Sequence, residues 1–132
     1  MTAAQKATVG ALLRDLNARG FNRYVHGGCV GADYDFHRLV VDNPYLAELR
    51  VFPSNMLHAR SPLFGATSVA SPQYPLDRNR LIVRYVAQNS GCMLATPKEV
   101  QEQLRSGTWS TVRYTRKCRV PLHLVLPDGT IV

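Results

Sequence analysis

Apolar residues recur along the chain at two spacings, one typical of helices and the other of buried strands. Val9, Leu12 and Leu16 are spaced as on one face of a helix that begins near Thr2 and ends at Gly20. The unbroken apolar run 92–95 instead favours a strand covered on both faces. Applied along the whole chain, these patterns predict helices at 2–19, 32–42, 77–90, 98–104 and 109–117, and strands at 21–26, 49–52, 92–95, 120–126 and 131–132.

Strands that alternate with helices in this way predict an α/β fold class, a three-layer α/β/α arrangement with a mostly parallel sheet. The chain of 132 residues has the length of one domain, so we expect a single domain over 1–132. Residues 54–75 have no clear period and form the longest irregular segment, which in a small domain is usually functional or mobile. Ligands of such sheets bind beyond the carboxyl ends of the strands.

The composition limits the partners that we expect. Hydrophobic residues make up 45% of the chain, but no apolar run approaches the roughly 20 residues of a membrane span, so we expect no membrane partner. The first residues lack the apolar region of a secretory signal, which favours a cytoplasmic location. The net charge of +7 indicates attraction to an anionic partner without selecting one.

Cysteine and histidine positions argue against a metal centre. Cys29, Cys92 and Cys118 lie far apart and form no C-x-x-C motif, and the four histidines are scattered. We therefore expect neither a metal nor a cofactor.

A glycine-rich turn is the strongest candidate for ligand binding. Gly27, Gly28 and Gly31 follow a predicted strand and open directly into the helix that contains Asp33. This layout predicts free backbone N–H groups at a helix N-terminus, where a phosphate is favoured. The plainer alternative is that these glycines only form a turn and that Asp33 only stabilises the helix N-terminus.

Two further segments are expected at the same edge of the sheet. Arg78 offers a planar set of donors for phosphate, and Asn79 can bond a base or ribose. The third segment contains Ser106, Gly107, Thr108 and Trp109. Its hydroxyls and N–H groups suit an anion and its indole suits stacking, although Ser106 can be only an N-cap and Trp109 only a core residue.

These segments, read in order, resemble a known family. The runs 26–33, 76–83, 94–97 and 105–114, with Pro127-Asp128-Gly129, are similar to the small Rossmann-like proteins of the SLOG superfamily, which includes the Lonely guy phosphoribohydrolases and DNA-processing protein A. The resemblance spans nearly the whole chain. It implies a nucleotide pocket in which the glycines of 27–31 line the phosphate loop, Arg78 and Asn79 approach the ligand, and 106–108 close the opposite side.

The chain departs from the pattern of these relatives at two places. Thr111 stands where the Lonely guy enzymes have a glutamate implicated in cleaving the N-glycosidic bond, so enzymatic activity is uncertain and a non-catalytic role is favoured. Relatives also begin with a strand ahead of the helix that starts here near Thr2. A start codon placed too late is the explanation we favour, and re-paired strands or a strand from another molecule are the alternatives.

The leading hypothesis is binding or sensing of a nucleotide or nucleotide derivative through the glycine-rich loop. An N-glycosidic hydrolase acting on a nucleoside monophosphate is the first alternative. Single-stranded nucleic-acid binding is the second, suggested by the charge and by Arg113, Arg116 and Lys117. A homodimer also stays open.

Overall fold

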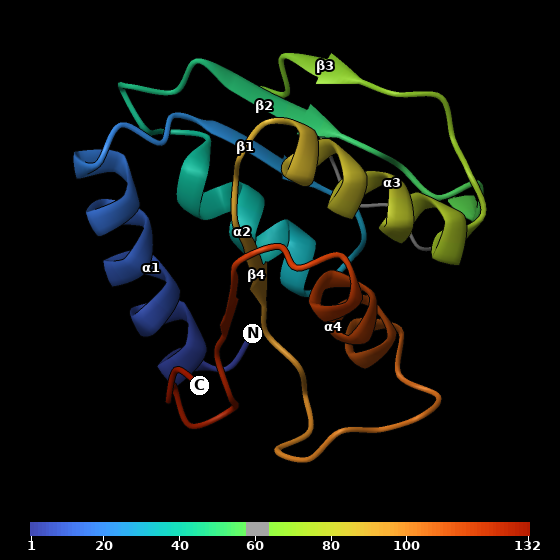
Figure 1. Ribbon diagram of the computed structural model, residues 1–132. Coiled ribbons are helices and arrows are strands. Elements are labelled where there is room, and N and C mark those ends of the chain that lie inside the picture. The colour runs from blue at the N-terminus through green and yellow to red at the C-terminus, as the bar shows by residue number, and fades with distance from the viewer. Residues whose placement is uncertain (58–63) are drawn as a thin grey trace. The chain divides into compact units, whose positions relative to one another are not determined.

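The computed structural model describes residues 1–57 and 64–132, which alternate between helix and strand. In chain order the elements are α1 (Ala3–Ala18), β1 (Arg23–His26), α2 (Ala32–Val40), β2 (Glu48–Val51), β3 (Ser68–Val69), α3 (Pro75–Gln88), β4 (Met93–Ala95), α4 (Gly107–Lys117) and β5 (Leu122–Leu124) (Figure 1). The strands pair in parallel. This mixed α/β architecture is compatible with the Rossmann-like class that the sequence predicts.

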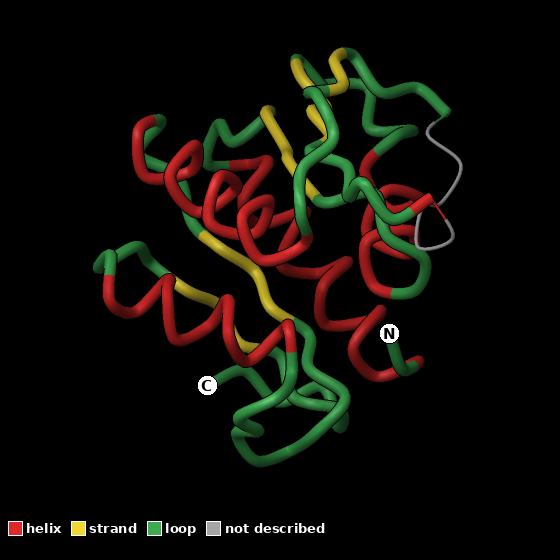
Figure 2. The backbone as a smooth tube through the Cα atoms, turned by 90° about the vertical axis from the view of Figure 1, so that its right-hand side faces the viewer, coloured by secondary structure: helices red, strands yellow, loops and turns green. Residues whose placement is uncertain are grey.

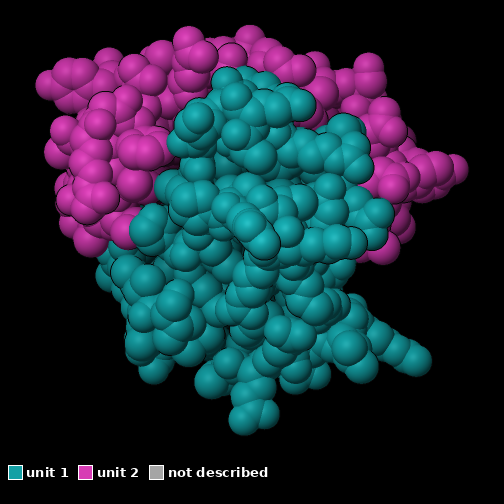
Figure 3. Space-filling view, in the orientation of Figure 1, with its two compact units in different colours: residues 1–9, 79–132 teal, residues 10–78 magenta. Residues whose placement is uncertain are grey.

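The chain divides into two compact units, one of residues 10–78 and one of residues 1–9 and 79–132 (Figure 3). The strands also form two sheets, in the orders β1-β2-β3 and β4-β5, and no pairing within the described ranges joins the two. The prediction of parallel strands in an α/β fold is confirmed, and they lie in these two small sheets.

In the unit of residues 10–78, β1 and β2 pair in register from Arg23 opposite Glu48 to His26 opposite Val51. Alternate side chains of both strands are buried, as the two-residue period of a strand predicts, so one face of each strand is buried although both contain charged residues. Helix α2 packs on β1 through the ring of Phe36, whose centroid lies 6.1 Å from that of Tyr24. This packing places the start of α2 directly beyond the carboxyl end of β1.

The sequence prediction missed β3, a strand of only two residues within the segment 54–75. Its pairing with β2, Arg50 opposite Ser68 and Val51 opposite Val69, extends the sheet to three strands. An isolated parallel bridge also pairs Ser54 with Gln73, near the two ends of this segment. The segment therefore adds paired residues to the sheet, while most of its described residues are loop and residues 58–63 lie outside the described part of the chain.

In the other unit, β4 and β5 pair from Met93 opposite Leu122 to Ala95 opposite Leu124. Helix α4 covers this pair, and a core of Ala95, Trp109, Val112 and Leu124 joins them. The first turn of α1 is anchored here by Gln5, which is 2% exposed. Its amide donates to the carbonyl oxygens of Pro97 at 2.9 Å and Val125 at 3.0 Å.

The helix expected at 98–104 does not form. The residues between β4 and α4 are loop, drawn in green in Figure 2. Arg113 of α4 donates to the carbonyl oxygens of Gln103 at 3.2 Å and Leu104 at 3.1 Å, and it contacts Glu102 at 3.3 Å. These bonds hold the loop against α4, and they are tertiary contacts that the local pattern of 98–104 does not show.

Within residues 1–57 and 64–132, no helix is both long enough and apolar enough to cross a membrane.

Candidate functional site

The turn between β1 and α2 has a backbone that requires glycine at two positions. Gly28 has φ 66° and Gly31 has φ 91°, in the region that L residues rarely adopt. Gly31 is also the N-cap of α2, where no side chain accepts a hydrogen bond from the helix. The first-turn amides of an α-helix have no intrahelical acceptor, so the N-terminus of α2 carries donors and partial positive charge without a cap.

The guanidinium of Arg78 lies beneath this turn. The residue is 5% exposed, and its Nη1 donates to the carbonyl oxygen of Gly27 at 2.6 Å and to that of Phe52 at 3.3 Å. Its Nη2 lies 3.2 Å from Sγ of Cys29. The sequence prediction placed Arg78 near the turn correctly, but its fork of donors holds the loop backbone rather than facing outward.

Gly27 is required for close packing rather than for an unusual φ. A Cβ at this position would lie 2.8 Å from Cζ of Arg78 and 2.9 Å from Oδ2 of Asp33. Both distances are too short for ordinary contact. The absence of a side chain at Gly27 therefore lets a cation and an anion approach the same point of the backbone.

Two amides of the turn are already engaged within the loop. The Gly28 N–H donates to Nδ1 of His26 at 2.9 Å, and the Cys29 N–H donates to Oδ2 of Asp33 at 3.0 Å. The expectation that these two N–H groups are free is wrong, because neighbouring side chains accept from them. The remaining donors are those of the first turn of α2, at Ala32 and the residues that follow.

Two buried histidines lie next to the turn and were not predicted. His26 is 4% exposed and His37 is 2% exposed, and Nε2 of His26 lies 2.9 Å from Nδ1 of His37. Nε2 of His37 contacts the carbonyl oxygen of Phe64. The available signal was the alternation of buried positions in β1, which places His26 on the same face as Tyr24.

The charge state of His26 follows from its surroundings. Burial lowers the pKa of His26 from 6.5 to about 4; the carboxylate of Asp33 opposes this shift, and His37 and Arg78 add to it. Near neutral pH the imidazole of His26 is therefore uncharged.

The third predicted segment belongs to the other unit. Ser106 is the N-cap of α4, and its hydroxyl accepts from the Trp109 N–H at 3.3 Å. Trp109 is 4% exposed and lies in the core, so both residues have the structural role named in the plainer alternative, and their contact with a ligand stays a prediction. Gly107 and Thr108 are exposed.

The structure brings Gly27, Gly28, Asp33 and Arg78 together within residues 10–78. Asn79 follows Arg78 on α3 and is counted with the other unit, as is the segment 106–109. That these residues meet the β1–α2 turn over one ligand stays a prediction.

Thr111, which the sequence resemblance aligns with the glutamate of the Lonely guy enzymes, forms a local hydrogen bond within α4. Its hydroxyl donates to the carbonyl oxygen of Gly107 at 3.0 Å, one turn earlier in α4. A threonine hydroxyl held in this way supplies no carboxylate for bond cleavage.

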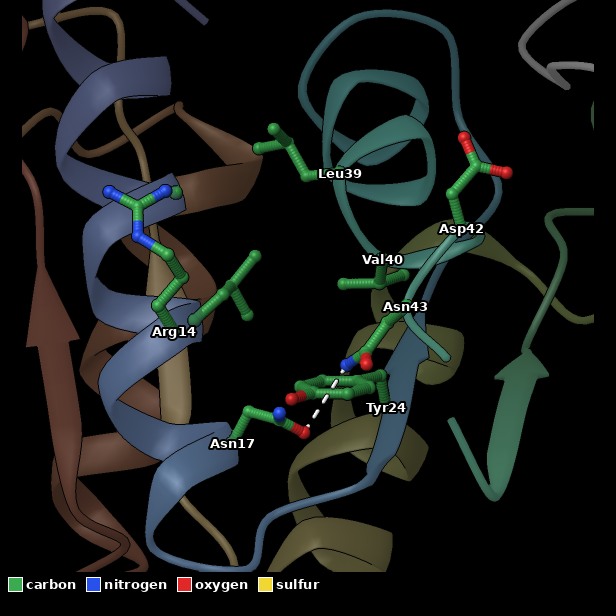
Figure 4. A pocket seen from close by; sticks show the side chains of 9 residues that line it. Arg14, Asn17, Tyr24, Leu39, Val40, Asp42 and Asn43 are labelled. Carbon is green, nitrogen blue, oxygen red and sulfur yellow. Dashed lines mark hydrogen bonds between the residues drawn. The ribbon is translucent and has the colours of Figure 1, made fainter. Parts of the chain in front are cut away.

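A hollow of about 290 Å³ lies in the unit of residues 10–78, between α1 and the end of α2 (Figure 4). Leu39 and Val40 line one side of it, and the ring of Tyr24 lies across its floor. Asn43 bridges to Asn17 at 3.3 Å beside this ring. The lining is mainly apolar and contains none of the predicted ligand residues.

Within the described ranges, no group of three or more His, Cys, Asp or Glu side chains is placed to hold a metal ion. No protein-family model, curated protein or solved structure matches the chain.

Proposed function

We propose that the β1–α2 turn binds the phosphate of a nucleotide or nucleotide derivative, and that the protein binds or senses such a ligand. The observation that carries this proposal is the N-terminus of α2, where the N-cap Gly31 supplies no capping side chain. An external anion is the acceptor that suits these donors and the helix dipole.

Three further features support the same proposal. Gly28 and Gly31 have positive φ angles that favour glycine. Because neither residue has a side chain, neither blocks a ligand that approaches the N-terminus of α2. The buried cation of Arg78 offsets the carboxylate of Asp33, which is itself engaged with the Cys29 N–H. The net charge of +7 favours association with anions, and the resemblance to the SLOG superfamily implies a nucleotide ligand.

The test is to titrate the protein with nucleoside monophosphates, ADP-ribose and cyclic nucleotides and to measure binding by calorimetry. Val30, in the turn, is 61% exposed, so Val30→Glu places a like charge beside the phosphate with little effect on folding. We expect about tenfold weaker binding. Val100→Glu, at a residue that is 65% exposed in the other unit, is the matched control.

Each outcome distinguishes one of the hypotheses. Nucleotide binding that Val30→Glu weakens and Val100→Glu does not supports the proposal. Release of free base from a monophosphate would instead favour the N-glycosidic hydrolase. Tight, salt-sensitive binding of an oligonucleotide with none of a mononucleotide would favour nucleic-acid binding. The absence of any binding would contradict all three hypotheses.

A further inference from the structure

A series of three hydrogen bonds runs from Gly28 through His26 and His37 to Phe64. The groups at its two ends determine which atom donates in each bond. A backbone N–H can only donate, so Nδ1 of His26 must accept from Gly28 and its proton must lie on Nε2. A carbonyl oxygen can only accept, so Nε2 of His37 must donate to Phe64. Nδ1 of His37 then accepts from Nε2 of His26, at 2.9 Å.

This chain of bonds is complete only when both imidazoles are neutral. A proton added to His26 makes Nδ1 a donor, which then faces the Gly28 N–H donor. A proton added to His37 makes its Nδ1 a donor toward His26. The proton of His26 must then move to its own Nδ1, with the same effect on Gly28. Either protonation therefore removes the acceptor of the Gly28 N–H, unless the contact between the rings breaks instead.

We propose that binding of an anion at the β1–α2 turn is coupled to uptake of a proton by His26, because a proton on His26 releases the Gly28 amide toward the ligand and adds positive charge next to the turn. This inference rests on the proposed function, since it concerns the same turn and specifies how binding there depends on pH.

The groups facing His26 determine the sign of the effect. His37 and Asp33 face it from α2, and Arg78 faces it from α3. Without ligand, burial keeps the pKa of His26 at about 4, with His37 and Arg78 acting in the same direction and Asp33 against them. A bound anion, like the Asp33 carboxylate, favours the protonated imidazole and raises this pKa. The affinity for the anion must therefore rise as the pH falls from the pKa of His26 in the complex toward its pKa in the free protein.

The probe is ADP-ribose, because its diphosphate stays fully ionised between pH 5 and 8 and contributes no proton of its own. Titrations at pH 7.5 and 5.5 should show an affinity about fourfold higher at the lower pH, because the bound anion raises the pKa of His26 in the complex. Calorimetry at pH 5.5 in two buffers of different ionisation enthalpy measures the protons taken up. We expect net uptake.

Two substitutions of His26 separate its hydrogen bond to Gly28 from its hydrogen bond to His37. His26→Asn keeps an oxygen near Nδ1 to accept from Gly28 but cannot titrate, so affinity should not rise with acid. His26→Gln places its amide near Nε2, toward His37, and leaves Gly28 without its acceptor. It should bind ADP-ribose more tightly than His26→Asn at pH 7.5. Asp33→Asn removes the carboxylate that faces His26 and should keep the rise in affinity with acid.

Nuclear magnetic resonance of the wild-type protein gives a readout that does not depend on folding of the variants. The Nδ1 resonance of His26 and the amide resonance of Gly28 should move with one midpoint in a pH titration. Separate midpoints overturn the inference. Binding of ADP-ribose without acid enhancement or proton uptake overturns it too, but leaves the proposed function standing. The absence of binding at every pH overturns both.

Discussion

The guanidinium of Arg78 donates to the carbonyl oxygen of Gly27 at 2.6 Å, although 51 residues separate them in the sequence. This bond fixes the start of α3 against the end of β1. The bond also explains why the cationic side chain of Arg78 is nearly buried next to Gly27, which has no side chain. The predictions below follow from this relationship and from similar buried polar contacts.

Gly27→Ala should destabilise the protein by about 1–3 kcal/mol, because the added Cβ meets the Arg78 guanidinium and the Asp33 carboxylate. Denaturant unfolding monitored by circular dichroism measures the change. Gly10→Ala is the matched control: its Cβ has its nearest neighbour at 3.7 Å within a helix, so it should be neutral or stabilising. Equal stabilities for the two variants would show that Gly27 has room for a side chain.

Arg78→Lys should lower the free energy of unfolding by roughly 2–3 kcal/mol, because one ammonium cannot reproduce the fork that reaches Gly27, Phe52 and Cys29. Arg80→Lys on the same helix is the comparison. Arg80 is exposed and lies over the ring of Tyr114 at 5.3 Å, a contact that lysine keeps in part. A loss at Arg80 as large as that at Arg78 would contradict the buried role of Arg78.

Acid should destabilise the protein through His26. The pKa of His26 is about 4 in the folded protein, below its ordinary 6.5, so the folded state binds fewer protons between these values. The contribution of His26 is therefore full above pH 6.5 and is lost as the pH falls toward 4, by roughly 3 kcal/mol in all. Unfolding curves between pH 7.5 and 4.5 measure this slope. His26→Asn should flatten it, and identical slopes would exclude His26 as the source.

Gln5→Glu should cost about 3 kcal/mol at neutral pH, because a carboxylate oxygen would replace the amide that donates to Pro97 and Val125. Gln5 is 2% exposed, so water cannot compensate. Gln101→Glu makes the same chemical change at an exposed residue and should have an effect within about 0.5 kcal/mol. Comparable losses from both changes would place the cause in net charge rather than in the buried bonds.

The sequence predicted those helices and strands that the local spacing of apolar residues is enough to determine. Val9 and Leu16 were assigned to one helix by their spacing, and both are buried. The helix at 98–104 was wrong: these residues form a loop, and Arg113 bonds its carbonyl oxygens in contacts that no local pattern shows. Strand β3 was missed because two residues are too few for a period to be read.

For the candidate site, the sequence identified the residues that carry an unusual backbone or charge, but not their partners. Gly28 and Arg78 were named from the motif, and both lie at the turn. The pairing of His26 with His37 could not be read from the sequence, because it depends on how α2 packs against β1. The core position of Trp109 likewise depends on how α4 covers β4.

The most direct test of the proposed phosphate site is the change in backbone amide resonances on titration with ADP-ribose. If the β1–α2 turn binds phosphate, the amides of residues 28–34 should shift most and should saturate together. Saturating shifts confined to the hollow lined by Leu39 and Val40, with the turn unchanged, would contradict the proposal.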